Sequence, residues 1–93
     1  MGKWNRRLRE KATQAFALPE DVLLHLPVVH LVGGQRLDME NHRGLVEYTS
    51  ECIRVRTTLG ETVIRGKELL LKEIGPEDLM VLGTIEGLET RLK

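Results

Sequence analysis

From residue 22 to the end of the chain, apolar and polar residues alternate with a period of two. Turn signals that contain glycine interrupt this alternation about every 8 to 12 residues. A period of two places successive side chains on opposite faces of an extended strand. Because the region lacks helical stretches that could connect parallel strands, neighbouring strands are expected to run antiparallel. The pattern predicts a mainly β fold, an antiparallel meander that forms a small β-sandwich or barrel.

The glycines give the expected ends of the strands. Gly33-Gly34 is typical of a hairpin turn, and the run from Gly75 to Asp78 indicates a longer turn. Gly66 and Lys67 are expected to form a turn between two short strands, and Gly87 to form a turn or a bulge.

The N-terminal segment has a different pattern. Residues 3–16 contain neither glycine nor proline, and Trp4, Leu8 and Phe16 recur at helical spacing together with two alanines. Pro19 ends the pattern, because the residue before a proline is disfavoured in the α region. We therefore divide the chain into a basic amphipathic helix (1–18) and an all-β domain (19–93). The basic side chains of the helix are Lys3, Arg6, Arg7, Arg9 and Lys11.

Charge separates the same two parts. The chain is neutral as a whole, but residues 1–17 carry a net charge of +4 and the remainder carries −4. The helix could therefore serve as an anchor, with its apolar stripe in a bilayer interface or on a partner and its cations on anionic headgroups. Alternatively, the stripe packs on the protein's own sheet. A basic arm could also bind nucleic acid, but the β domain offers only Tyr48 as a stacking platform, so nucleic acid is the weaker expectation.

The sequence contains no recognisable catalytic or metal-binding motif. Cys52 is the single cysteine, which excludes an intramolecular disulfide and a cysteine-based zinc site. The three histidines lack metal-ligand spacing, and no phosphate-binding loop or nucleophile motif is present. We expect a protein that is not an enzyme and that needs no cofactor or metal. Because the start of the chain does not resemble a signal peptide, we expect a cytoplasmic location.

The densest polar cluster is the run Glu40-Asn41-His42-Arg43-Gly44. It could be a recognition turn that contacts a partner. Alternatively, it is a turn in which the Asn41 side chain bonds to its own neighbouring backbone. The residues alone favour the second interpretation.

Several motifs, taken in order, resemble those of the YabP/YqfC family of sporulation proteins. They are Glu40-Asn41-His42-Arg43-Gly44, then Gly60, then Ile64-Arg65-Gly66 with Leu69, then Gly83-Thr84-Ile85 with Gly87. The basic, tryptophan-containing start that leads into Leu18-Pro19-Glu20-Asp21-Val22 is similar to the YqfC branch. The resemblance implies an all-β protein of an endospore-forming bacterium, without known catalysis, that has a YqfD-like membrane protein as its partner.

Together these observations predict an interaction or scaffold module of a sporulating cell, held peripherally at a membrane or against a membrane-associated partner. Open sheet edges give a route to protein partners and to self-association, because an unpaired edge can accept another strand. The alternative is a nucleic-acid-binding regulator that uses the basic helix as its arm.

Overall fold

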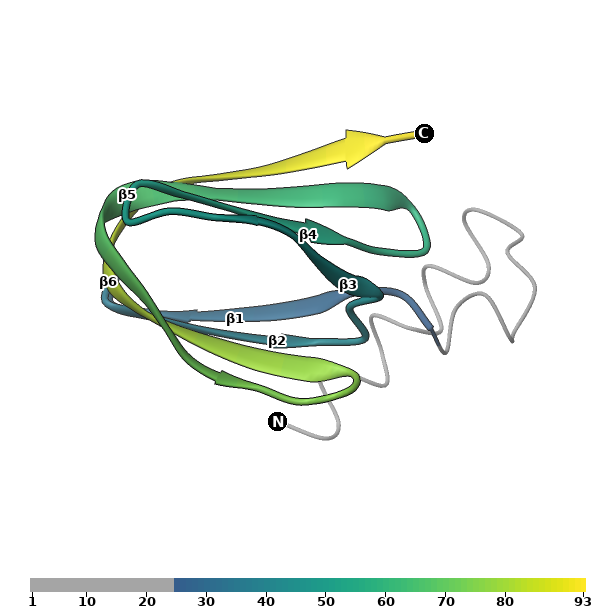
Figure 1. Ribbon diagram of the computed structural model, residues 1–93, viewed down its shortest axis with the longest axis horizontal. Coiled ribbons are helices and arrows are strands. Elements are labelled where there is room, and N and C mark those ends of the chain that lie inside the picture. The colour runs from purple at the N-terminus through teal and green to yellow at the C-terminus, as the bar shows by residue number, and fades with distance from the viewer. Residues whose placement is uncertain (1–24) are drawn as a thin grey trace.

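The computed structural model describes residues 25–93, and these residues form one six-stranded antiparallel sheet (Figure 1). The strands are β1 (Val28–Val32), β2 (Arg36–Glu40), β3 (Gly44–Tyr48), β4 (Cys52–Arg56), β5 (Gly60–Ile74) and β6 (Asp78–Leu92). Their order across the sheet is β1-β2-β6-β5-β4-β3. Strands β3 to β6 therefore form a meander, and the β1–β2 hairpin joins it by pairing β2 with β6. The predicted mainly β, antiparallel fold is confirmed.

The sheet folds over itself into two layers because β5 and β6, each 15 residues long, bend near their middle (Figure 1). β4 pairs only with the first half of β5, and β2 pairs only with the first half of β6. The upper layer thus contains β3, β4, the first half of β5 and the second half of β6. The lower layer contains β1, β2 and the other halves of the two long strands.

The bend corrects the expectation of a turn at Gly66 and Lys67. The chain does not reverse there; β5 continues through a shift in its register with β6. A side chain on Gly66 would overlap the carbonyl oxygen of Thr84, and one on Gly83 would lie 2.5 Å from the carbonyl oxygen of Glu68. These glycines therefore let the two long strands approach closely where both bend. Gly87 lies inside β6 beside the register shift between its partner Arg65 and Gly66, so of the turn or bulge expected there the structure shows the bulge.

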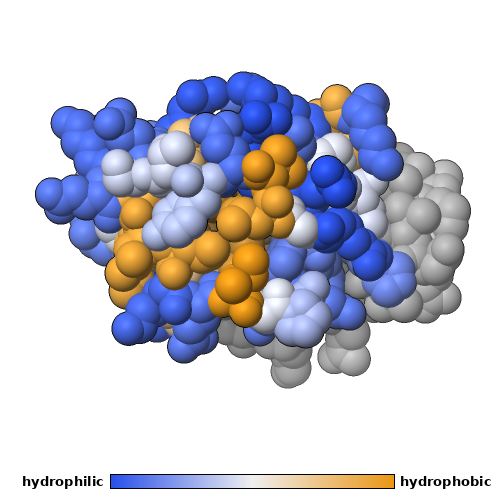
Figure 2. Space-filling model, viewed as in Figure 1, coloured by the Kyte–Doolittle hydropathy of each residue, from blue (hydrophilic) through white to orange (hydrophobic). Residues whose placement is uncertain are grey.

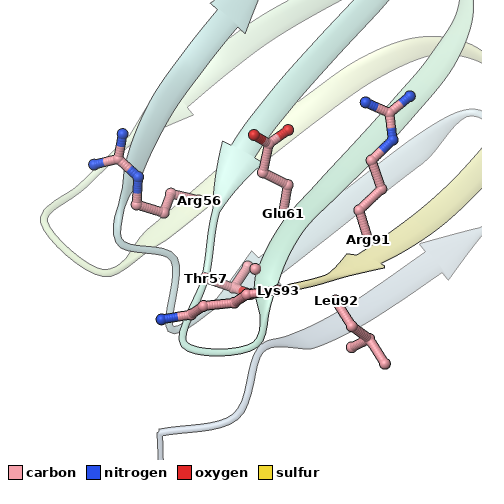
Figure 3. A pocket seen from close by; sticks show the side chains of 7 residues that line it. Arg56, Thr57, Glu61, Arg91, Leu92 and Lys93 are labelled. Atoms are coloured by element: carbon pink, nitrogen blue, oxygen red, sulfur yellow. The ribbon is translucent and has the colours of Figure 1, made fainter.

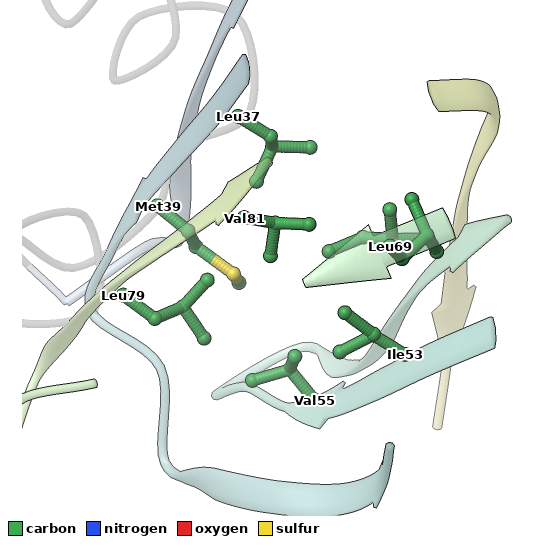
Figure 4. Close-up of a cluster of buried hydrophobic side chains, with 8 residues drawn as sticks. Leu37, Met39, Ile53, Val55, Leu69, Leu79 and Val81 are labelled. Atoms are coloured by element: carbon green, nitrogen blue, oxygen red, sulfur yellow. The ribbon is translucent and has the colours of Figure 1, made fainter. Parts of the chain in front are cut away.

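The core lies between the layers. Leu37 and Met39 of β2, with Leu79 and Val81 of β6, face Ile53 and Val55 of β4 and Leu69 of β5 (Figure 4). All seven side chains are buried, with at most 4% of their surface exposed. They occupy alternate positions along their strands, so the period of two in the sequence is the core-facing pattern.

The strand ends agree with the sequence at the Gly33-Gly34 turn and at the turn from Gly75 to Asp78. The predicted helix at 1–18 lies outside the described residues, as does the start of the predicted all-β domain, so the structure does not test the division of the chain.

Candidate functional site

The predicted recognition turn is the connection that crosses from the lower layer to the upper layer. Glu40 ends β2 and Gly44 begins β3. Asn41 has a φ of +68°, a left-handed conformation that asparagine adopts more readily than most residues. Its side-chain amide donates a 2.8 Å hydrogen bond to the carbonyl oxygen of Leu26, fifteen residues earlier in the chain. The Asn41 side chain therefore holds the segment that precedes β1.

His42 is buried, with 4% of its surface exposed, and both of its ring nitrogens are hydrogen-bonded. The backbone N–H of Gly44 donates to Nδ1 over 3.1 Å. This bond assigns the ring proton to Nε2, which lies 2.9 Å from the carbonyl oxygen of Gly75 and 3.1 Å from that of Asp78. The imidazole is thus a neutral bridge between the crossing segment and the β5–β6 turn.

The crossing segment therefore has an inner and an outer part. Asn41 holds the segment that precedes β1 and His42 holds the β5–β6 turn, whereas the side chains of Glu40 and Arg43 are exposed. Only the exposed pair is available to a partner, and the recognition role of this turn stays a prediction. The predicted anchor lies outside the described residues; its members are Lys3, Trp4, Arg6, Arg7, Leu8, Arg9, Lys11 and Phe16.

Exposed apolar side chains gather along two strand edges that lie close together, β3 and the second half of β5. We call this set the open-side surface, and it consists of Leu45, Val46 and Tyr48 of β3 with Leu70 and Ile74 of β5. Each of them exposes between 39% and 50% of its surface. Figure 2 shows hydrophobic surface collected over this region, on the face turned toward the viewer.

Three of these side chains, Leu45, Tyr48 and Ile74, face inward and are exposed because the sandwich is open on that side. Leu70 lies between the inward-facing Leu69 and Leu71 and pairs with Leu82, so it is exposed on the outer face of the lower layer. Leu45 pairs with Val55 and Tyr48 with Ile53, so both point toward the inner, core-facing side of the upper layer. However, β3 is the last strand of the sheet order, and β4 does not extend along the second half of β5. Core-type residues at these positions therefore remain half-covered, which is the arrangement of an interaction surface.

Hydrogen bonds bridge the open side. The hydroxyl oxygen of Tyr48 accepts the backbone N–H of Leu71 over 2.9 Å, and the carbonyl oxygen of Ser50 accepts that of Leu69 over 2.8 Å. They connect the end of β3 and the loop that follows it to the edge of β5, while His42, just before the start of β3, bonds to the β5–β6 turn. The open-side surface is thus held in place by bonds at both of its ends.

An ion-pair network connects β3, β4 and β5 on the upper layer. The Arg54 guanidinium contacts Glu61 through Nε (2.9 Å) and Nη2 (3.0 Å), and Glu47 through Nη1 (3.1 Å). The hydrogen bonds from Arg54 lower the pKa of Glu61, and the pKa of Arg54 is raised by its bonds to Glu61 and Glu47. Because these groups are partly solvated, the network contributes to the alignment of β3 more than to stability.

A shallow pocket of about 400 Å³ lies where β4, β5 and β6 end (Figure 3). Arg56, Glu61 and Arg91 stand side by side across the three strands, with Lys93 beside them. The only side-chain carboxylate of the lining is Glu61, which is already bound by Arg54. The pocket can therefore offer positive charge to an anion, but the side chains of its lining do not supply the pair of carboxylates that glycoside hydrolysis uses.

Two further features of the described residues bear on function. Within 25–93, no group of three or more histidine, cysteine or acidic side chains is placed to hold a metal ion. The same part of the chain contains no helix of the length and hydrophobicity needed to cross a membrane.

The fold and its exposed edges define a class, a small β-sandwich whose most distinctive surface is apolar and lies along open strand edges. Comparison with known proteins gives the family. The model of the YabP family matches residues 26–91. The "Uncharacterized protein YqfC" of Bacillus subtilis (strain 168) is 35% identical over 86 residues, which covers 92% of each chain. The chain belongs to the YabP family, and no solved structure matches it.

Sequence reasoning did not find the open-side surface. Tyr48 and Ile74 look like ordinary core positions, because Tyr48 stands between Glu47 and Thr49 and Ile74 follows Glu73. Their exposure follows from the strand order, which puts β3 at an edge and leaves half of β5 unpaired on one side. The run of three leucines at 69–71 was the available signal, since at least one of three successive strand residues must face away from the core.

Proposed function

We propose that this protein is a non-enzymatic interaction module of a sporulating cell, which uses the open-side surface to bind another protein. The observation that carries the proposal is the exposure of five apolar side chains along two open edges, at positions that hydrogen bonds hold in place at both ends. Apolar surface of this kind favours association, and open edges favour pairing with added chain.

The proposed partner is a membrane-associated sporulation protein of the YqfD type. Family membership and the resemblance to the YqfC branch support this choice, together with the basic amphipathic segment predicted at residues 1–18. A cytoplasmic domain with such a segment would lie peripherally at the membrane, where the cations of the segment meet anionic headgroups.

Leu70 gives the sharpest test of the surface. Its side chain is 50% exposed on the second half of β5, and Val32, 57% exposed on β1, is the matched control on a different edge. The intact chain is co-produced with a YqfD-like membrane protein, and the amount that purifies with the membrane fraction is compared for the wild type, Leu70→Glu and Val32→Glu.

We expect Leu70→Glu to lose most of the co-purification, because it places a charge in a contact that excludes water. Val32→Glu should retain it. Equal retention by both variants would contradict the proposed surface. If removing residues 1–17 abolished salt-sensitive DNA binding, and the intact chain failed to float with anionic vesicles, the nucleic-acid-binding alternative would replace the proposal.

A further inference from the structure

We infer that β3 pairs antiparallel with β3 of a second copy of this chain, around a twofold axis, so that the upper layers of two molecules form one continuous sheet. This inference goes beyond the proposed function: it assigns the β3 part of the open-side surface to a second copy and leaves the β5 part, Leu70 and Ile74, to the membrane partner. Three properties of β3 support it.

The first property is an unprotected edge. β3 is the terminal strand of the sheet order, and its five residues contain neither the proline nor the lysine that commonly block edge pairing. Its register with β4 shifts between Leu45 and Glu47, and this irregularity keeps Leu45 and Tyr48 on one face of the strand. Three of the five, Leu45, Val46 and Tyr48, expose apolar surface. The described part of the chain offers no further strand for this edge.

The second property is that the strand matches itself on its inner face. Leu45 and Tyr48 point to the same inner side, because their partners Val55 and Ile53 are both in the core. Residues directly opposite each other on antiparallel strands share a face. A twofold register that places Leu45 opposite Tyr48 of the second copy therefore forms two apolar pairs on the core side.

The third property is opposite charge at the two ends of the strand. Arg43 precedes β3 and Glu51 follows it, and both side chains are exposed and have no ion pair among residues 25–93. In the register that pairs Leu45 with Tyr48, Arg43 lies opposite Ser50 of the second copy, next to that copy's Glu51. The twofold axis repeats the contact, so two complementary ion pairs form at once.

β1, the other terminal strand, lacks this complementarity. It also exposes apolar side chains, Leu31 and Val32. However, it is followed by Gly33-Gly34 and Gln35, so its C-terminal end carries no charge. The charge pattern therefore selects β3 as the self-pairing edge.

Charge reversal tests the twofold arrangement directly. In Arg43→Glu, residue 43 meets Glu51 of an identical copy, and both contacts become repulsive. In Glu51→Arg, both contacts place two arginines together. A mixture of the two variants restores two attractive pairs in the heterodimer. Glu86→Arg, at an exposed position of β6 outside β3, is the control for the change in net charge.

The masses of the intact chain and its variants are measured by sedimentation equilibrium at low ionic strength. We expect the wild type and Glu86→Arg to dimerise, and each β3 variant to dimerise about tenfold more weakly or worse. The equimolar mixture should recover the wild-type affinity. Far-UV circular dichroism confirms that each variant keeps its β structure.

A wild-type chain that remains monomeric up to about 1 mM would overturn the inference. So would a dimer that is insensitive to both reversals, or a mixture that associates no better than its components. The proposed function is tested separately, by the co-purification of a membrane partner with the wild type and with Leu70→Glu. A failure of the dimer would leave that result unchanged, so the two failures are distinguishable.

Discussion

Replacement of His42 is the sharpest test of how the two layers are held together. In His42→Ala, the N–H of Gly44 and the carbonyl oxygen of Gly75 lose the imidazole as their partner in a part-buried place, whereas the carbonyl oxygen of Asp78 keeps its bond from the N–H of Gly75. Each of the two ring nitrogens supplies about 1 kcal/mol of net stabilisation, and the lost ring leaves a cavity that costs about 1–2 kcal/mol more. The expected loss in the free energy of unfolding is therefore about 3–4 kcal/mol.

Such a loss would be a large part of the total stability, because a domain of this size is stable by only about 5–14 kcal/mol. It should lower the midpoint of thermal unfolding by about 12 °C or more. The measurement is urea denaturation followed by circular dichroism, with calorimetry for the thermal midpoint. His25→Ala is the control, because the His25 side chain is exposed, and it should change stability by at most about 0.5 kcal/mol.

His42→Phe separates hydrogen bonding from volume. The phenyl ring fills most of the space of the imidazole but can neither accept from Gly44 nor donate to Gly75 and Asp78. We expect a loss of about 2 kcal/mol, because the N–H of Gly44 and the carbonyl oxygen of Gly75 lose this partner. A phenylalanine variant as stable as the wild type would refute the assignment of His42 as a hydrogen-bonded bridge.

Three further predictions concern the bend, the ion-pair network and the bridge across the open side. Gly66→Ala should lower the free energy of unfolding by at least about 3 kcal/mol in urea denaturation, because the backbone of Thr84 occupies the space that the new side chain needs. Gly87→Ala is the control and should be nearly neutral, because the nearest atom to its new side chain, Cβ of Arg65, lies 3.9 Å away. Arg54 lowers the pKa of Glu61 in the folded state, so this stabilisation is present at neutral pH and is lost as the pH falls through that lowered pKa. Glu61→Gln should therefore reduce the decline of the urea midpoint with acidification, and an unchanged pH profile would argue against the network. Tyr48→Phe removes the acceptor of a β5 backbone N–H, so hydrogen exchange of that amide should accelerate while the amides of β4 stay protected.

The polar turn from Glu40 to Gly44 shows how far sequence reasoning reached at the site. Its composition marked it as unusual, and its place between two strands was correct. That His42 is buried could not be predicted, because its partners at Gly75 and Asp78 are more than thirty residues away in the chain. Such contacts depend on the β5–β6 turn meeting the crossing segment, which only the folded sheet brings about.

The sequence by itself determined which segments are extended and that they pair antiparallel, because the period of two and the turn residues act over a few neighbouring positions. It also determined the family, through motifs in a fixed order. Tertiary structure alone decided that Gly66 lies at a bend and not in a turn, since the close approach of β5 and β6 requires both strands to be present. Tertiary structure also decided that Leu45 and Tyr48 are exposed. The exposure of an inward-facing side chain depends on whether another strand covers the edge of its own strand, and no described strand covers β3.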